Sequence, residues 1–341
     1  MRAEPYLRMK TGVKRKLLPF YFRSLPWANA LINARFGRGF STRYIPRELM
    51  IEVTNRCNAN CVMCPHEKMK RPRGHMAWDI FTKIVDDASR FEGRGLWITL
   101  HKDGEPLLDP LLFDRIARVR ERLPRSWIQF NSNAQLLTDD MAARLLQSPP
   151  DRVVFSVDGA TRETYEDIRG GLNYDVVCRN IESFLDRRRA AGSPLKVTMQ
   201  MVVNRENLPE VDAYRRRWGG KVDLIVLKPM HNFLVKGTSA RGAGLETFQR
   251  ARCLQPFSNM VIFWTGDLGL CCWDYDNLVG LGNVRDAHLL DLYNGPKFMA
   301  VRRAMIRKNC SGVEPCSACS RIYGRDDPMA CEWSNGIPVL E

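Results

Sequence analysis

The sequence lacks the features of membrane-spanning and secreted proteins. No stretch of the 341 residues approaches the roughly 18 consecutive apolar residues that a membrane-spanning helix needs. No signal peptide, with its charged, apolar and small-residue regions, opens the chain, so we expect a cytoplasmic protein. In that reducing compartment the eleven cysteines are expected to bind metal rather than to form disulfides. The apolar content of 45% is enough for one large core and a small appended unit.

Acidic residues are scarce in the first 50 positions, which hold eleven Lys or Arg but only two Asp or Glu. This excess predicts a basic N-terminal arm, residues 1–47, ahead of the first strand. The arm mixes its charges with leucines and aromatic residues over positions 14–36, so it could make peripheral contact with an anionic membrane surface. Alternatively, it packs its apolar side against the rest of the protein. We expect no nucleic-acid partner.

Strands and helices are predicted to alternate after the arm, at intervals of roughly 25–30 residues, which indicates βα units and a parallel sheet. The predicted strands are 49–53, 96–101, 127–131, 152–157, 196–203 and 221–227. The predicted helices lie near 78–90, 111–123, 138–147, 174–191 and 208–218. Six units are too few for an eight-stranded barrel, so the predicted fold class is α/β, with an open, partial (β/α)6 barrel over residues 48–228. Reactive groups are then expected at the carboxyl ends of the strands.

Three cysteines, Cys57, Cys61 and Cys64, follow the first predicted strand. Three thiolates at this spacing can hold three corners of a [4Fe–4S] cube and leave one iron open for chemistry. A zinc site or chance spacing is the alternative. The CxxxCxxC loop after a first strand, in a chain of strand–helix units, resembles the radical SAM superfamily. Met63 stands where that family usually has an aromatic residue.

This resemblance implies that S-adenosylmethionine binds the open iron and that a reducing partner, such as flavodoxin or ferredoxin, supplies one electron. In the family, cleavage of the cofactor gives a 5′-deoxyadenosyl radical that removes a hydrogen atom from the substrate. The turn Gly104-Glu105-Pro106 resembles the family's Gly-Gly-Glu-Pro element, which holds the cofactor's amino group, with Asp103 in place of the first glycine. Ordinary turn chemistry is the alternative. The other residues that the resemblance assigns to the cofactor are Asn131, Asn133, Ser156, Asp158 and Val203.

A second group of cysteines lies in a predicted C-terminal unit, residues 253–341, after a linker of residues 229–252. Segments 259–265 and 268–273 predict a hairpin that turns at Gly266-Asp267, and 296–306 predicts a helix. Four cysteines brought together here suit a fully protein-ligated [4Fe–4S] cluster, with zinc as the alternative. The pattern resembles the SPASM/twitch extension of radical SAM enzymes. Its four predicted ligands are Cys253, Cys271, Cys316 and Cys319.

The number of auxiliary clusters depends on cysteines beyond Cys319. None lies between Cys319 and Cys331, which favours the one-cluster twitch form over the two-cluster SPASM form. Cys178 falls in a predicted helix and is expected to be a small buried hydrophobe. Cys310 and Cys331 are expected either to bind a cluster or to pack.

Twitch enzymes act on sugars, cyclitols and aminoglycoside-like molecules, so the resemblance implies a small polyhydroxylated substrate. Dehydrogenation is expected if the auxiliary cluster accepts an electron, and epimerisation if a thiol returns a hydrogen. One alternative is a peptide-modifying maturase, against which we count the short segment before the first strand. A non-catalytic metal-binding protein is the other. The candidate catalytic residues are Cys272, as the thiol donor, and Lys102 and His231, as proton acceptors or hydroxyl binders. Asp103, Lys228 and Asp274 are further polar candidates.

Overall fold

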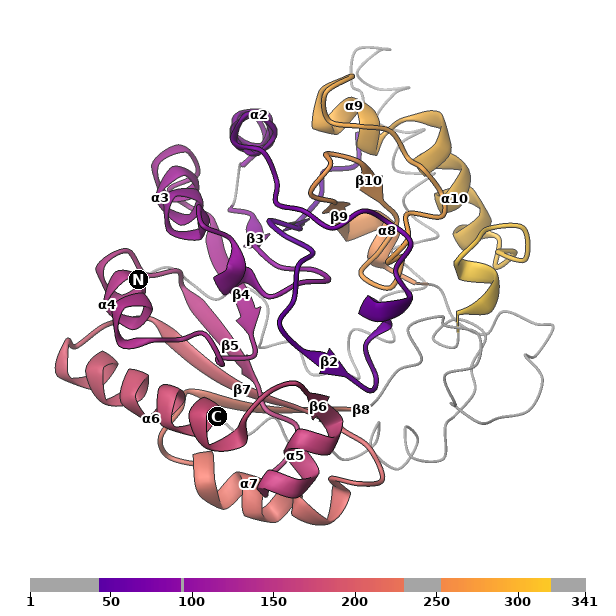
Figure 1. Ribbon diagram of the computed structural model, residues 1–341. Coiled ribbons are helices and arrows are strands. Elements are labelled where there is room, and N and C mark those ends of the chain that lie inside the picture. Colours follow the sequence, from indigo (N-terminus) through magenta and orange to yellow (C-terminus); the bar gives the residue numbers. More distant parts are fainter. Residues whose placement is uncertain (1–42, 93–94, 230–252, 320–341) are drawn as a thin grey trace.

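The computed structural model describes residues 43–92, 95–229 and 253–319 (Figure 1). Its centre is one eight-stranded sheet with the strand order β10-β9-β1-β3-β4-β5-β7-β8. Six of these strands are parallel to one another and confirm the predicted partial barrel: β1 (Glu48–Ile51), β3 (Trp97–Thr99), β4 (Trp127–Ser132), β5 (Arg152–Ser156), β7 (Lys196–Val203) and β8 (Leu224–Pro229). The fold class is therefore α/β, as the spacing of the strands predicts.

Helices cover the outer face of this sheet (Figure 1). The five predicted ones are α2 (Trp78–Ser89), α3 (Leu112–Arg122), α4 (Asp139–Gln147), α6 (Tyr174–Ala190) and α7 (Val211–Trp218), the last preceded by η3 (Leu208–Glu210). Helix α2 buries Ile80, Phe81, Ile84 and Val85, spaced so that they form one apolar face. Side-chain caps fix where some helices begin. At the start of α4, for example, the Thr138 hydroxyl accepts a hydrogen bond from the Met141 amide.

Among the short elements that were not predicted from the sequence, three lie close to one another. Helix α5 (Arg162–Ile168) follows β5, and the two-residue strands β2 (Asn60–Cys61) and β6 (Arg169–Gly170) pair antiparallel. A pairing of two residues shows no periodicity in the sequence, because it spans a single repeat of the strand pattern and less than one helical turn. It nevertheless ties the loop of the first three cysteines to the chain that follows α5.

Alternate residues of the strands face the helices and the inside of the barrel. In β1, Leu49 and Ile51 are fully buried in the core. Glu48 points to the inside, where its carboxylate accepts hydrogen bonds from Thr99 Oγ1 at 2.7 Å and Asn259 Nδ2 at 2.5 Å. Gln129 Nε2 donates to Thr99 Oγ1 at 3.1 Å. The inside of the barrel is therefore lined by hydrogen-bonding side chains at this level.

The C-terminal unit continues the barrel sheet. Its elements are α8 (Gln255–Ser258), β9 (Asn259–Ile262), β10 (Leu268–Gly269), α9 (Leu289–Tyr293), α10 (Pro296–Ile306) and η4 (Cys316–Ala318). Strand β9 pairs in parallel with β1, from Glu48 opposite Asn259 to Ile51 opposite Ile262, and β10 pairs antiparallel with β9. The predicted hairpin is present, with shorter strands, and Gly266 adopts a φ of 89° in its turn. The division of the chain into an arm, a barrel, a linker and a C-terminal unit stays a prediction.

Among the residues described, no helix has the length and apolar character needed to cross a bilayer. Residues 43–47, at the end of the predicted arm, lie against the C-terminal unit. The Tyr44 ring meets Phe257 edge-on at 5.7 Å between centroids, and the Tyr44 amide donates to Asn294 Oδ1 at 2.7 Å. The rest of the arm and nearly all of the predicted linker lie outside the described residues.

Candidate active site

The loop that carries Cys57, Cys61 and Cys64 begins where β1 ends, at the carboxyl edge of the sheet. Its first residues are fixed by buried hydrogen bonds. Thr54 Oγ1 donates to the Gly74 carbonyl at 2.8 Å, and the Gly74 amide donates to Asn55 Oδ1 at 2.8 Å. The structure thus places the three cysteines where catalytic groups gather in barrels of this kind.

Cys57 and Cys61 are half-buried and Cys64 is exposed, and the protein packed around the three thiols raises their pKa values by desolvation. Burial raises the pKa of Cys57 to about 11 and that of Cys64 to about 12. Cys61 lies beside Arg169, whose Nη1 is 3.8 Å from its Sγ. Thiols with raised pKa values become thiolates readily only when a metal replaces their protons. This donor set therefore fits a metal cluster, and the neighbouring arginine is suited to the negative charge of the bound form.

The Gly104-Glu105-Pro106 turn lies directly against the cysteine loop. A side chain on Gly104 would place its Cβ 2.5 Å from the Thr54 carbonyl oxygen and 2.7 Å from that of Arg56. The Glu105 amide donates to the Arg56 carbonyl at 2.8 Å. Only glycine permits this approach, so the structure explains why the turn needs Gly104.

The carboxylate of Glu105 is engaged by the protein itself. It is 2% exposed, and it accepts hydrogen bonds from the amides of Asn133 at 2.7 Å and Leu107 at 3.1 Å. Burial raises the pKa of Glu105. This geometry makes Glu105 a residue that holds the ends of β3 and β4 together. The contact of Gly104, Glu105 and Pro106 with the cofactor's amino group stays a prediction.

The remaining predicted cofactor residues lie at the ends of β4, β5 and β7, on the same edge of the sheet. Asn133 Nδ2 donates to Asn58 Oδ1 in the cysteine loop at 2.8 Å. Asp158 is fully buried, pairs with Arg169 at 2.7 Å and accepts from the Val202 amide at 2.7 Å. These two side chains position the loop and its arginine. The other three residues of the set, at the same edge, are Asn131, Ser156 and Val203.

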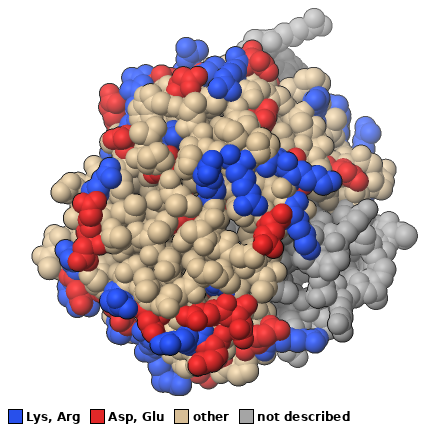
Figure 2. Space-filling view, viewed as in Figure 1, with Lys and Arg blue, Asp and Glu red and all other residues tan. Residues whose placement is uncertain are grey.

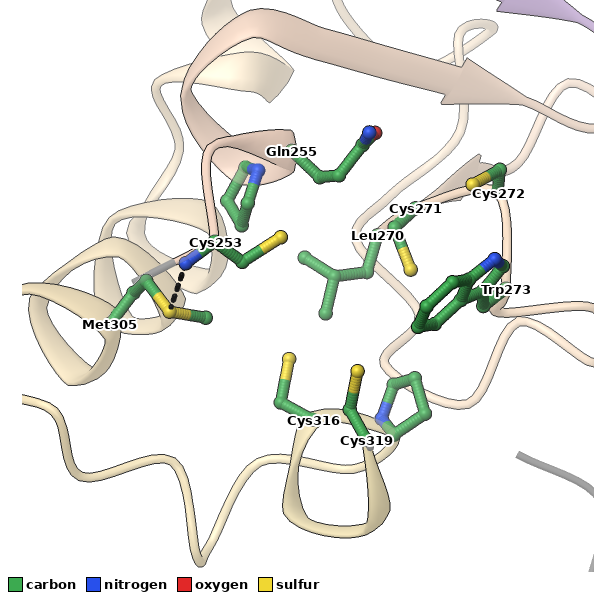
Figure 3. A pocket seen from close by; sticks show the side chains of 11 residues that line it. Cys253, Gln255, Leu270, Cys271, Cys272, Trp273, Met305, Cys316 and Cys319 are labelled. Atoms are coloured by element: carbon green, nitrogen blue, oxygen red, sulfur yellow. Dashed lines mark hydrogen bonds between the residues drawn. The ribbon is translucent and has the colours of Figure 1, made fainter. Parts of the chain in front are cut away.

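The four predicted auxiliary ligands line one pocket of the C-terminal unit (Figure 3). Their sulfur atoms point into the same space, whereas the thiol of Cys272, which also lines the pocket, lies apart from these four (Figure 3). The pocket walls are mostly apolar and include Leu270, Trp273 and Met305. Burial raises the pKa of Cys271 well above its usual range. A pocket of four convergent sulfurs fits an iron–sulfur cluster, and its donor set also fits zinc.

Among the described residues, no three His, Cys, Asp or Glu side chains are close enough to hold a single metal ion between them. Cys310 is fully buried beside Cys316, and the hydrogen bond between the two thiols, together with burial, raises the pKa of Cys316. Cys178 lies on the buried face of α6 and packs in the hydrophobic core, as expected for a small hydrophobic residue. His231 and Cys331 lie outside the described residues.

The candidate catalytic residues differ in their surroundings. Lys102 is buried, forms an ion pair with Asp103 and lies 4.9 Å from the centroid of the Phe263 ring. Lys228 is exposed as a whole residue, but the protein around its amino group desolvates that group and lowers its pKa. The negative charges of Cys272 and Glu48 act in the opposite direction. The roles of Lys102 and Cys272 stay predictions.

Three charged residues of this region, Glu52, Arg71 and Arg169, were not singled out from the sequence. Glu52 carries a charge yet is fully buried, because it lies within an apolar segment, Met50 to Val53. A buried carboxylate needs a cation as its partner, so a glutamate within an apolar strand could have indicated a buried ion pair from the sequence alone. The distant partners, Arg71 and Arg169, carry no comparable signal.

Two family models match the chain. The Radical SAM superfamily model matches residues 51–216, and an iron–sulfur cluster-binding domain, SPASM, matches residues 253–320. A tungsten-containing aldehyde ferredoxin oxidoreductase cofactor-modifying protein of Pyrococcus furiosus is 31% identical over 343 residues, which cover 85% of this chain and 95% of that protein. The chain belongs to the radical SAM superfamily. Its cofactors are S-adenosylmethionine and a [4Fe–4S] cluster, and its C-terminal domain binds auxiliary iron–sulfur.

Other proteins resemble the chain over a shorter stretch of sequence or in fold. The mycofactocin maturase MftC of Mycobacterium tuberculosis is 26% identical over 198 residues, 57% of this chain, so the match spans about half (47%) of that relative. A probable GTP 3',8-cyclase of Methanococcus maripaludis is 30% identical over 192 residues, 55% of this chain and 61% of that protein. The crystal structure of BtrN in complex with AdoMet and 2-DOIA shares the fold, with a TM-score of 0.59 at 16% identity, over 84% of this chain and 99% of that one.

Proposed function

We propose that this radical SAM enzyme removes a hydrogen atom from a peptide held between its two cysteine sites. The peptide-modifying alternative of the sequence analysis gains support from a relative named as a maturase. The main hypothesis from the sequence, a sugar-like substrate that is dehydrogenated or epimerised, has less support.

One observation carries the two-site proposal: β9 of the C-terminal unit pairs along the whole length of β1. The cysteine loop leaves the end of β1, and the auxiliary pocket lies just beyond β10, the partner of β9. Both sites are therefore built on neighbouring strands of one sheet. A substrate in the barrel would be adjacent to both.

The inside of the barrel suits a chain with amide groups. Glu48, Thr99, Gln129 and Asn259 form a hydrogen-bonded series across four strands. In the part of the chain that the structure describes, β8 and β10 are the two ends of the sheet and do not pair, so the barrel stays open along one side. An open side admits an extended chain more easily than a closed barrel would.

The protein's own residues hold the reacting groups in place. Asn133 and Arg169 fix the cysteine loop, and Glu105 joins the turn beside it to the end of β4. When bound, the cluster and S-adenosylmethionine supply the radical that removes a hydrogen atom from the substrate. The chain supplies position, exclusion of water and a route for the electron.

We place the enzyme in the cytoplasm with an acidic electron carrier such as flavodoxin or ferredoxin. Basic side chains gather near the middle of the face shown in Figure 2, and the segment around the cysteine loop contributes exposed Arg56, Lys68, Lys70 and Arg73. Positive charge of this kind accelerates the approach of an acidic partner. Turnover supported by flavodoxin should therefore fall with added salt, whereas turnover supported by dithionite should not. Equal salt dependence would contradict this partner.

The substrate class is tested with protein reconstituted with iron and sulfide in the absence of oxygen. Reductant and S-adenosylmethionine are added, together with a panel of synthetic peptides whose Cα and Cβ hydrogens are replaced by deuterium. We expect a peptide to transfer deuterium to 5′-deoxyadenosine and to change in mass. Transfer only from members of a parallel panel of deuterated sugars would favour the sugar-like substrate.

A second candidate is a small nucleotide-like substrate. The observation that favours it is the 30% identity to a protein named as a probable GTP 3',8-cyclase. Deuterium transfer from ribose-labelled nucleotides, with no transfer from any peptide, would establish it in place of the peptide proposal.

A further inference from the structure

A buried ion network with Arg71 at its centre lies between the cofactor turn and the C-terminal unit. Arg71 donates two parallel hydrogen bonds to the Glu52 carboxylate, at 2.9 and 2.8 Å. The same guanidinium donates to Asp103 Oδ2 at 3.1 Å and to the Tyr275 carbonyl at 2.6 Å. One side chain thereby joins four segments that are far apart in the sequence.

Two of these segments belong to the cofactor side. Glu52 directly follows β1, the strand that leads into the cysteine loop. Asp103 precedes Gly104, whose close contact with the Thr54 and Arg56 carbonyls sets the position of the cofactor turn. Asp103 also pairs with Lys102, so its carboxylate is shared by two cations. Asp103, which stands in place of the first glycine of the family's Gly-Gly-Glu-Pro element, thus has a structural role in this chain.

The C-terminal unit supplies the other side of the network. The Arg71 guanidinium carbon lies 4.0 Å from the centroid of the Phe263 ring, which also lies near Lys102. The Trp264 amide donates to Glu52 Oε2 at 3.1 Å. Next to Tyr275, the Asp276 carboxylate accepts from the Lys70 amide at 2.8 Å. Tyr275 and Asp276 follow Cys271 closely, so the network reaches the segment that carries an auxiliary ligand.

The burial of the network limits how its members can move. Glu52 is fully buried, and the side chains of Arg71 and Asp103 are 11% and 12% exposed. A buried charge is tolerated only while its partner and its hydrogen bonds stay in place. The planar guanidinium of arginine makes several such bonds in fixed directions, which lysine cannot reproduce. Any displacement of the C-terminal unit relative to the cofactor turn would therefore separate opposite charges.

We propose that Arg71 is a positioning residue that couples the S-adenosylmethionine site to the auxiliary cluster. It holds the Gly104 turn and the Phe263–Asp276 segment in one fixed relation, so that both cofactors face the same substrate. Asp103 is the link that joins this coupling to the cofactor turn. The inference rests on the proposed two-site function but does not depend on whether the substrate is a peptide.

The test uses the reconstituted enzyme with S-adenosylmethionine alone and no substrate. Variants Arg71→Met and Arg71→Lys are compared with Arg118→Met, which removes a surface ion pair to Asp86 on the helical side. For Arg71→Met we expect unchanged iron content, a KM for S-adenosylmethionine raised about tenfold and a broader distribution of distances between the two reduced clusters in pulsed EPR. Arg71→Lys should lie between wild type and Arg71→Met, and Arg118→Met should match wild type.

A second variant keeps the proposal falsifiable if Arg71→Met folds poorly. Asp103→Asn leaves the Glu52–Arg71 pair in place and removes only the charge that links it to the cofactor turn. It should raise the same KM at unchanged iron content, with a lower thermal midpoint because the buried Lys102 loses the charge that it pairs with. A KM and a distance distribution within about twofold of wild type in Asp103→Asn, or in a folded Arg71→Met, would overturn the proposal. A wild-type protein that does not cleave S-adenosylmethionine would instead refute the proposed function.

Discussion

At the scale of single residues, two strand-end carboxylates that are predicted to contact the cofactor are also held by the protein itself. Glu105 accepts hydrogen bonds from two backbone amides, and Asp158 pairs with Arg169. The sequence could place both residues at the correct edge of the sheet, because the ends of parallel strands meet there. It could not tell whether each carboxylate faces a ligand or an amide, since that depends on loops that close from elsewhere in the chain.

The contact between the cofactor turn and the cysteine loop leaves no room for a side chain at position 104. We expect Gly104→Ala to push the turn away from the Thr54 and Arg56 carbonyls, because both obstacles are backbone atoms. The cost should be about 1–3 kcal/mol of stability, with weaker binding of S-adenosylmethionine. Calorimetric titration of the reconstituted protein with S-adenosylmethionine measures the change in binding. Gly312→Ala is the matched control, because nothing lies within 4 Å of its Cβ position. Equal effects of the two substitutions would contradict the prediction.

Adjacent cysteines should differ in their effect on iron content, because the Cys271 thiol points toward the other three predicted ligands and the Cys272 thiol lies apart from them (Figure 3). Two [4Fe–4S] clusters correspond to about eight irons per chain. We expect Cys271→Ala to lower the iron content to about four and Cys272→Ala to leave it unchanged. Iron and sulfide assays of both variants decide this. Loss of iron in Cys272→Ala alone would place the ligand at the neighbouring position.

At the scale of elements, predictions for long periodic segments hold, whereas several short elements were not predicted. The six parallel strands and five covering helices follow from hydrophobic spacing. Helix α5 and the β2–β6 pairing were missed, because their stability comes from tertiary contacts rather than from local pattern. Helix α5 is held in place by Glu210, which comes from η3, far along the chain.

Glu210 should give the protein a measurable dependence on pH. Burial alone would raise its pKa, but hydrogen bonds from the Thr161 and Thr164 hydroxyls and from the Ala160 and Thr161 amides outweigh burial and lower the pKa. A lowered pKa in the folded state means that stability is present above the unfolded pKa of about 4.3. That stability is lost as the pH falls through the folded value.

We expect Glu210→Gln to cost about 0.5–1 kcal/mol at neutral pH and to flatten the loss of stability in acid. Urea unfolding at several pH values measures both effects. Glu206→Gln, an exposed position in the preceding turn, is the control. A parallel shift of the whole pH profile in Glu210→Gln would show that the carboxylate does not titrate as described.

At the scale of the whole molecule, the sequence predicted two cysteine sites but not how they are joined. The hairpin was expected in an appended unit. In the structure it extends the barrel sheet, since β9 pairs with β1. Strand pairing between residues about 200 positions apart leaves no trace in local pattern, because it is decided by which exposed strand edge is available.

This shared sheet predicts cooperative unfolding of the barrel and the C-terminal unit. Separation would leave the backbone groups of β1 and β9 without partners, which is costly for buried strands. Calorimetry of the reconstituted protein should therefore show one transition for both parts. Two well-separated transitions, with the auxiliary cluster released in only one of them, would contradict this expectation.

The bond between Glu48 and Asn259 has a consequence for protein engineering. C-terminal units could be exchanged between relatives to change the chemistry that follows hydrogen removal. Such an exchange would place a new side chain at position 259, opposite the unchanged carboxylate of Glu48. A working chimera would need its inward-facing β1 residues transplanted together with the new unit. The first strand of the barrel is, in this sense, part of the module that begins some two hundred residues later.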